Sequence, residues 1–180
     1  HILHGQYDFP DDLEKLGQIK GEDNHIAVIH IDGNGIGNVI REIGSLEDTT
    51  QFSNHLRSAV TNAFGRLLQM ILVDLKSSPE IASEYNINPL EGKTMLPLRP
   101  IIMGGDDITF VANGKFGIYF MVKYMEYFNE ALQSDPSYKN LSCCGGAAII
   151  KSRYPFYRGY HIAEELCASA KQKRIEQNGT

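Results

Sequence analysis

At 180 residues with 42% hydrophobic content, the chain is long enough for one domain with a full core, and disorder is not expected. Lys and Arg total 17 against 22 Asp and Glu, and the formal charge of −5 excludes a broad basic surface for nucleic acid. No apolar run approaches the roughly 18 residues of a membrane span, and three cysteines without CxxC spacing favour reduced thiols in a cytoplasmic protein with no membrane partner.

The first residues are polar and interrupted by glycine and proline. Such a stretch favours irregular structure, so we predict an N-terminal extension over 1–24 and a folded domain over 25–180. Because the chain begins with His1 and not with methionine, we expect it to be part of a longer protein.

Residues 26–31 form a nearly continuous β-branched run, which is typical of a central strand buried on both faces. His30 interrupts this run, and we expect a satisfied or pocket-edge histidine there, not a metal ligand. Asp32, Gly33, Asn34 and Gly35 follow directly and lead into a short helical pattern. This order puts Asp32 at the end of the strand, where the glycines let backbone N–H groups face a ligand.

The apolar spacing from Phe52 to Leu75 predicts a long core helix with Asp48 or Thr49 as its N-cap. Residues 77–97 are rich in proline and asparagine and are interpreted as a long connection.

Residues 101–111 contain two apolar runs joined by Gly104, Gly105, Asp106 and Asp107. β-branched and aromatic residues on both sides favour strands, and the glycines suit a tight turn, so we predict a hairpin with carboxylates at its tip. Glycine and aspartate are also ordinary turn residues, and a solvated turn without function stays open on this pattern alone.

A third helix over 116–132, a strand over 141–150 and a closing helix complete the chain. The last turns of the closing helix contain Lys171, Lys173 and Arg174, whose charges suit the helix dipole. The order is that of an α+β, ferredoxin-like βαββαβ unit, for which we expect an antiparallel sheet with helices on one face. In that topology the first strand lies beside the hairpin, so Asp32 can meet Asp106 and Asp107.

Three carboxylates at one sheet edge would repel one another unless a cation lay among them. Mg²⁺ (or Mn²⁺) prefers carboxylate and carbonyl oxygens, and two such ions about 3.5–4 Å apart would serve an in-line phosphoryl displacement. We expect two ions per site, with Asp32 and Asp106 as shared ligands. Asp107 would bind the second ion or orient a ligand, and the carbonyl of Ile31 or Gly33 would complete the shell.

Two motifs carry a resemblance to a known family. Ile-His-Ile-Asp-Gly-Asn-Gly-Ile-Gly at 29–37 and Ile-Met-Gly-Gly-Asp-Asp at 102–107 resemble the palm domain of the large subunit of type III CRISPR effector complexes, a relative of GGDEF diguanylate cyclases and adenylyl cyclases. The closing Ala-Glu-Glu-Leu-Cys-Ala-Ser-Ala-Lys at 163–171 is similar to the end of GGDEF-type domains. The resemblance covers residues 26–171 and identifies 25–180 as a palm domain.

The resemblance implies a metal-dependent nucleotidyltransferase that joins ATP by 3′–5′ linkages into cyclic oligoadenylates. Asp32, Asp106 and Asp107 would be the catalytic metal-site residues, and Lys171 would contact triphosphate. The nucleotide-binding residues would be Gly33, Asn34, Gly35, Gly104, Gly105 and Lys171, with Asn34 as a weaker base or ribose contact.

Two alternative functions and a set of expected partners accompany this resemblance. GGDEF proteins have Glu and Phe where this chain has Asp107 and Ile108, which argues against a diguanylate cyclase that uses GTP. A catalytically silent nucleotide-binding or subunit-interaction module is the other reading. One palm holds one half-site, so we expect a homodimer or a second palm domain, with CRISPR effector subunits as further partners.

Overall fold

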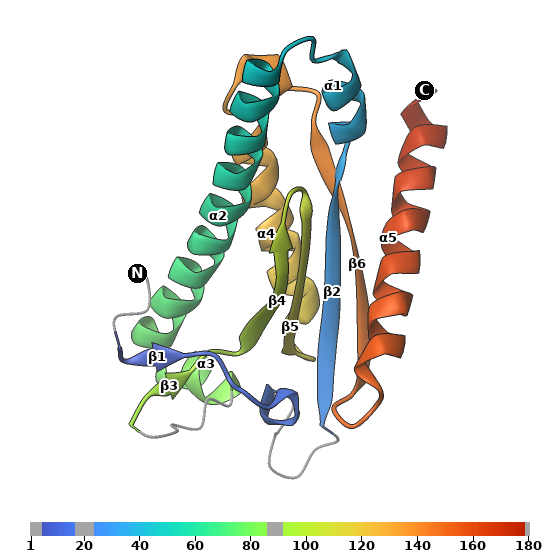
Figure 1. Ribbon diagram of the computed structural model, residues 1–180. Helices are drawn as coiled ribbons and strands as arrows, with labels where there is room; N and C mark the ends of the chain where they lie inside the picture. Colours follow the sequence, from blue (N-terminus) through green and yellow to red (C-terminus); the bar gives the residue numbers. More distant parts are fainter. Residues whose placement is uncertain (1–4, 17–23, 86–91, 179–180) are drawn as a thin grey trace.

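A computed structural model describes residues 5–16, 24–85 and 92–178 of the chain. Its centre is a four-stranded antiparallel sheet in the order β4-β5-β2-β6 (Figure 1). The strands are β2 (His25–Asn34), β4 (Leu98–Gly104), β5 (Asp107–Asn113) and β6 (Ser142–Lys151). Together with the helices between them they form the predicted βαββαβ unit, so the α+β, ferredoxin-like fold is confirmed, with the first strand of the unit at a central position.

Helices pack on both faces of this sheet. α2 (Leu46–Ser77) and α4 (Gly117–Leu132) cover one face, and α5 (Phe156–Asn178) crosses the other (Figure 1). The predicted placement of helices on one face therefore holds for α2 and α4, whereas α5 lies opposite them. Among the described residues, no helix combines the length and apolar character needed to cross a membrane.

The composition of β2 explains why both faces are covered. Ala27, Ile29 and Ile31 point into the core beneath α2 and α4, whereas Ile26 and Val28 point into a smaller core beneath α5. Successive side chains of a strand alternate between faces, so an unbroken apolar run leaves neither face suited to water. Helix α5 is therefore needed on the second face.

The long helix α2 begins earlier than its apolar spacing predicts. Ser45 is the N-cap, and its Oγ accepts a hydrogen bond from the backbone N–H of Asp48 at 3.0 Å, so the predicted cap at Asp48 or Thr49 is wrong. Leu46 and its neighbours in the first turn are exposed, and for this reason the apolar pattern becomes visible only from Phe52.

The connection after α2 contains structure of its own. A short helix α3 (Pro79–Glu84) follows at once, and β3 (Thr94–Met95) pairs in parallel with β1 (Tyr7–Asp8). The part of the predicted connection at 86–91 lies outside the described residues. The remaining elements are α1 (Ile36–Glu42) and the 3-10 turns η1 (Leu13–Leu16) and η2 (Pro136–Tyr138).

The described part of the N-terminal extension packs on the domain. Leu16 is buried in the smaller core, and its carbonyl accepts a hydrogen bond from Asn113 Nδ2 at 2.8 Å. Arg99 Nη1 donates to the Pro10 carbonyl at 2.6 Å. These contacts tie the extension to β4 and to the end of β5.

Candidate functional site

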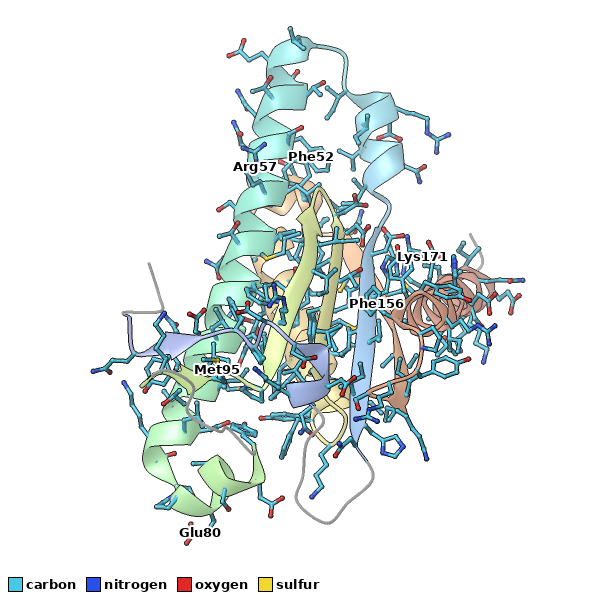
Figure 2. The ribbon with its side chains drawn as sticks, turned by 60° about the horizontal axis from the view of Figure 1, so that its bottom comes forward. Phe52, Arg57, Glu80, Met95, Phe156 and Lys171 are labelled. Carbon is cyan, nitrogen blue, oxygen red and sulfur yellow. The ribbon has the colours of Figure 1, made fainter. Side chains whose placement is uncertain are left out.

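Asp32 lies near the end of β2, opposite Cys144 of β6. Its Oδ2 accepts a hydrogen bond from Lys171 Nζ of α5, and the same Nζ donates to the carbonyl of Gly33 at 3.0 Å. Figure 2 shows Lys171 where α5 passes this strand. The structure therefore brings together the strand aspartate and the closing lysine, which are far apart in the sequence.

Asp106 reaches the same point from the hairpin. A Cβ built on Gly33 would lie 2.8 Å from Asp106 Cβ and 3.1 Å from Asp106 Oδ2. The carboxylate of the hairpin tip therefore rests directly over the backbone that follows Asp32. The β2-β5 pairing produces this meeting because the tip residues extend the ladder that ends at Ile31 and Ile108.

The environment of Asp106 favours its protonated form. Burial raises the pKa of this carboxyl above its usual range, and the negative charge of Asp32 raises it further. The ammonium group of Lys171 acts in the opposite direction and lowers it. A second cation close to these carboxylates would favour the ionised form.

Asp107, the next residue, turns toward the face of the sheet that α5 covers. Burial raises its pKa, the neighbouring His30 imidazole lowers it, and the negative charges of Asp32 and Glu164 raise it. Lys171 also lowers it. The Oδ1 atom of Asp107 lies 3.3 Å from His30 Nδ1.

His30 is the neighbour of this site whose function the sequence did not predict. It is buried, and its Nδ1 also lies 3.2 Å from Thr109 Oγ1. The expectation of a satisfied, pocket-edge histidine agrees with this position. One polar residue inside an otherwise apolar β-branched run was the available signal.

In the turn at the end of β2, Gly35 is notable for its backbone conformation and Asn34 for its side-chain contacts. Gly35 has a φ of 84°, a left-handed conformation that suits glycine, and it caps α1. The Asn34 side chain is buried and donates from Nδ2 to Ser142 Oγ and to Cys144 Sγ, each at 3.2 Å. Its amide nitrogen is thus engaged by β6, and its contact with a base or ribose stays a prediction.

The hairpin tip is a two-residue turn. Gly104 pairs with Asp107 across it, and Gly105 has a φ of 60°. A Cβ at either glycine would meet nothing within 4 Å, so no crowding by the described residues requires glycine there. The left-handed backbone of Gly105 does favour it.

A cavity of about 580 Å³ opens beside Lys171, between α1 and the end of α5. Its lining includes the turn at 33–35, Asn38, Asn140 and Arg174. The two cationic side chains outnumber the one carboxylate in the lining, Glu42, and together with amide groups around a glycine turn they suit an anionic ligand such as a phosphate. The sequence had assigned Arg174 only a role at the end of a helix, because its position against the turn depends on the tertiary fold.

The donor groups at this point fit a hard divalent cation. Two carboxylates, Asp32 and Asp106, and the Gly33 carbonyl converge there, and oxygen ligands of this kind suit Mg²⁺. The ammonium group of Lys171 contacts one carboxylate and that carbonyl, so it stands where a cation is favourable. Ile31, whose carbonyl was the other predicted backbone ligand, lies within β2 and is paired with the strands on both sides. Over the described ranges, no group of three or more His, Cys, Asp or Glu side chains has metal-site geometry.

Comparisons with known proteins agree with this architecture. A family model described as Cas10/Cmr2, second palm domain, matches residues 25–179. Among solved structures, the chain is similar to a Csm1-Csm4 cassette in complex with cA4, with a TM-score of 0.66 and 15% identity over 89% of this chain and 21% of that chain. It is also similar to Csm1 in T. onnurineus, with a TM-score of 0.61 and 16% identity over 93% of this chain and 23% of that chain.

The solved chains are much longer than the part that matches. The chain spans 21% of the length of the Csm1 chain in the cA4 complex and likewise of the apo cassette, which has a TM-score of 0.65 and 16% identity over 89% of this chain. At these identities the structural likeness establishes the fold. A sequence comparison with curated proteins gave no match.

Proposed function

Because the chain belongs to the Cas10/Cmr2 second palm domain family of type III CRISPR complexes, we propose that it is a metal-dependent nucleotidyltransferase palm that joins ATP into cyclic oligoadenylates. The observation that carries this proposal is the meeting of Asp32 and Asp106 over Gly33, with Lys171 beside them. Structures of the Csm1-Csm4 cassette in complex with one ATP, with pppApA and with cA4 support ATP as the nucleotide.

Asp32, Asp106 and the Gly33 carbonyl would hold one Mg²⁺ or Mn²⁺ ion, and Asp107 would contribute to a second. Bound ions of this kind neutralise phosphate charge and lower the pKa of an attacking hydroxyl. Their positive charge would also offset the repulsion that raises the pKa of Asp106. The carboxylates would thus be held in their ionised form.

Lys171 and Arg174 would bind the phosphates in the cavity beside the glycine turn. When an ion takes Asp32, the ammonium group of Lys171 is free to turn to a phosphate oxygen. The proposed reaction joins the 3′-oxygen of one ATP to the α-phosphorus of another. The bond from that phosphorus to the β-phosphate breaks, and pyrophosphate leaves.

A second palm would supply the attacking nucleotide. The matched family is a second palm domain, so a first palm of the same family or a second copy of this chain would be the partner. Ile101, Ile102 and Met103 support an interface near the site, because these exposed apolar side chains lie on the edge strand β4 just before the acidic tip. An exposed apolar edge strand is normally covered in a native assembly. Csm4-like CRISPR subunits are further candidates.

An Asp106→Asn variant tests the proposal. It keeps the shape of the side chain and removes its charge, so cyclic product from labelled ATP should fall at least about 100-fold if the carboxylate stabilises transition-state charge. Binding of AMPPNP, measured by thermal shift, should persist. Glu165→Gln is the matched control, because Glu165 is an exposed carboxylate on α5. Undiminished product from the Asp106 variant would refute the assigned site.

Two observations favour the silent nucleotide-binding module. Lys171 already neutralises Asp32, and no metal-ligand group is assembled among the described residues. Thermal stabilisation by ATP and Mg²⁺ without turnover, in the presence of a partner palm, would support this function. Competition between ATP and GTP in the same binding assay tests the diguanylate cyclase-like alternative, which requires GTP to bind more tightly.

A further inference from the structure

A small polar cluster lies beneath α5, on the face of the sheet that otherwise holds apolar side chains. His30 of β2 and Thr109 of β5 are directly opposite each other, and Asp107 lies two residues from Thr109 on the same face. His30 and Thr109 are both buried. The ring of Tyr160 meets the imidazole edge-on, with centroids 5.6 Å apart. The imidazole is therefore confined on several sides.

The two oxygens of Asp107 have different surroundings. Oδ1 is buried and makes no hydrogen bond of standard geometry, and His30 Nδ1 lies 3.3 Å from it. The Asp107 side chain as a whole is nevertheless 39% exposed. That exposure belongs to side-chain atoms other than Oδ1. Oδ1 is thus shielded inside the protein, while the rest of the side chain reaches the surface.

The contact between His30 Nδ1 and Asp107 Oδ1 favours the ring tautomer with a proton on Nδ1. An ionised carboxylate can only accept hydrogen bonds, so a bare Nδ1 lone pair at this distance would repel Oδ1. A protonated Nδ1 is attracted to it and is shared with Thr109 Oγ1 at 3.2 Å. The partner of one imidazole nitrogen sets the tautomer of the ring.

We propose that His30 is a positioning residue for Asp107: its Nδ1–H holds the buried Oδ1 against the sheet and directs Oδ2 toward the nucleotide site. A role for Asp107 Oδ2 in the reaction rests on the proposed function, whereas the contact between His30 and Asp107 Oδ1 does not. Residues that orient a metal-binding or phosphate-binding carboxylate contribute through the geometry they impose, and their loss typically costs about 10–100-fold in affinity or activity.

Nitrogen NMR of the histidine-labelled chain tests the anchoring without any turnover. The His30 signals are assigned by their loss in His30→Asn. We expect Nδ1 to be protonated in the wild type at neutral pH, and its protonation to be partly lost in Asp107→Ala. An unprotonated Nδ1 in the wild type would overturn the proposal, as would a His30 spectrum that Asp107→Ala leaves unchanged.

Three substitutions separate positioning from packing. Asn places an amide N–H where His has Nδ1, Gln places it near Nε2, and Phe keeps the ring volume without a donor. We expect His30→Phe and His30→Gln to lower kcat about 10–100-fold while KM for ATP changes less than about threefold, and His30→Asn to recover most of kcat. Equal activity of the three variants would overturn the positioning role.

A binding measurement keeps this inference distinct from the proposed function. If the wild type forms no product, Mn²⁺ affinity in the presence of AMPPNP still ranks the variants, and the same order of Asn above Gln and Phe is expected. Equal affinities would overturn the inference while leaving the Asp106 test unaffected. Thr109→Val is the control: it removes the competing hydroxyl at constant volume and should leave Nδ1 protonated toward Asp107.

Discussion

Gly33 lies where the two acidic segments meet, and its missing side chain allows them to meet. A Cβ there would lie 2.7 Å from Ile36 Cγ1 and 2.8 Å from Asp106 Cβ. Neither distance is compatible with van der Waals contact, so any larger residue would force the hairpin tip or α1 to move. One residue identity thus controls the separation of the carboxylates on β2 and on the hairpin.

Gly33→Ala should therefore damage the site. Overpacking of a buried position costs about 1–3 kcal/mol, so we expect a lower melting temperature, and we expect product formation to fall more than the loss of folded protein explains. Thermal melting and the labelled-ATP assay measure the two effects.

Gly37→Ala is the matched control for this change. Gly37 lies in α1, is exposed, and has no atom within 4 Å of a built Cβ. Alanine in an exposed helix is favoured over glycine by about 0.5–1 kcal/mol, so this variant should melt slightly higher with normal activity. Normal activity in both variants would contradict the role assigned to Gly33.

At the level of elements, the depth of α5 on the sheet decides whether Lys171 reaches Asp32. Gly159, Ala163 and Cys167 repeat every four residues on the side of α5 that faces the sheet, and Lys171 is next in this series. Beneath them, a Cβ at Gly146 of β6 would lie 2.0 Å from the Ala163 carbonyl oxygen. Small residues on both sides therefore allow the close approach.

Gly146→Ala should lift α5 from the sheet, because the obstacle is backbone that cannot rotate away. We expect a clear fall in melting temperature, about 2–4 °C for each kcal/mol lost in a chain of this size, and weaker ATP binding as Lys171 moves.

The adjacent glycine provides the control for this prediction. A Cβ at Gly145 would point to the other face and meet Met125 Sδ at 2.9 Å, Ile31 Cγ1 at 3.1 Å and Met121 Sδ at 3.2 Å, all of them side-chain atoms. Flexible methionine side chains can shift, so Gly145→Ala should be milder in both measurements. If Gly145→Ala is the more damaging change, the packing argument for α5 is wrong.

The edge strand β4 leads to a prediction about assembly. Ile102 is 40% exposed, just before the tip, and a charge there should leave the isolated fold intact. We expect Ile102→Glu to weaken association with a partner palm and to reduce product at least about tenfold, as for a central interface residue. Sedimentation with ATP and Mg²⁺ measures association. Val73→Glu, at a 62% exposed position on α2, should change neither the association nor the amount of product. Full product from Ile102→Glu would argue against this interface.

At the scale of the whole molecule, the acidic site opposes folding stability. Burial raises the pKa of Asp106 and of Asp107 above the usual aspartate range. A carboxyl with a higher pKa in the folded chain binds protons more tightly there than in the unfolded chain. The stability that it contributes is therefore present below its unfolded pKa and lost as pH rises through the folded pKa.

In EDTA at neutral pH, Asp106→Asn should consequently melt a few degrees above the wild type. The difference should shrink as pH falls and vanish below about pH 4, where aspartate is protonated in the unfolded chain as well. Melting curves over this pH range provide the measurement. A wild type that melts above Asp106→Asn at neutral pH would contradict the sign of this linkage.

Several features of the fold could be predicted because they depend on local pattern. The β-branched run of β2, the spacing of α2 and the Gly-Gly-Asp-Asp hairpin each carry their own periodicity or turn chemistry. The cap at Ser45 was missed because the first turn of α2 is exposed and lies outside the apolar stripe. Helix α5 was expected on the same face as α2 and α4, although the unbroken apolar run of β2 already required cover on both faces.

The sequence by itself determined the order of strands and helices, the acidic residues and their family resemblance, because these follow from neighbouring residues. Only the tertiary structure decided that Lys171 binds Asp32, that Asp106 rests on Gly33 and that His30 faces Asp107. Each of these contacts joins separate elements, and its geometry depends on how deeply α5 packs and where the hairpin turns. A one-dimensional pattern does not encode those distances.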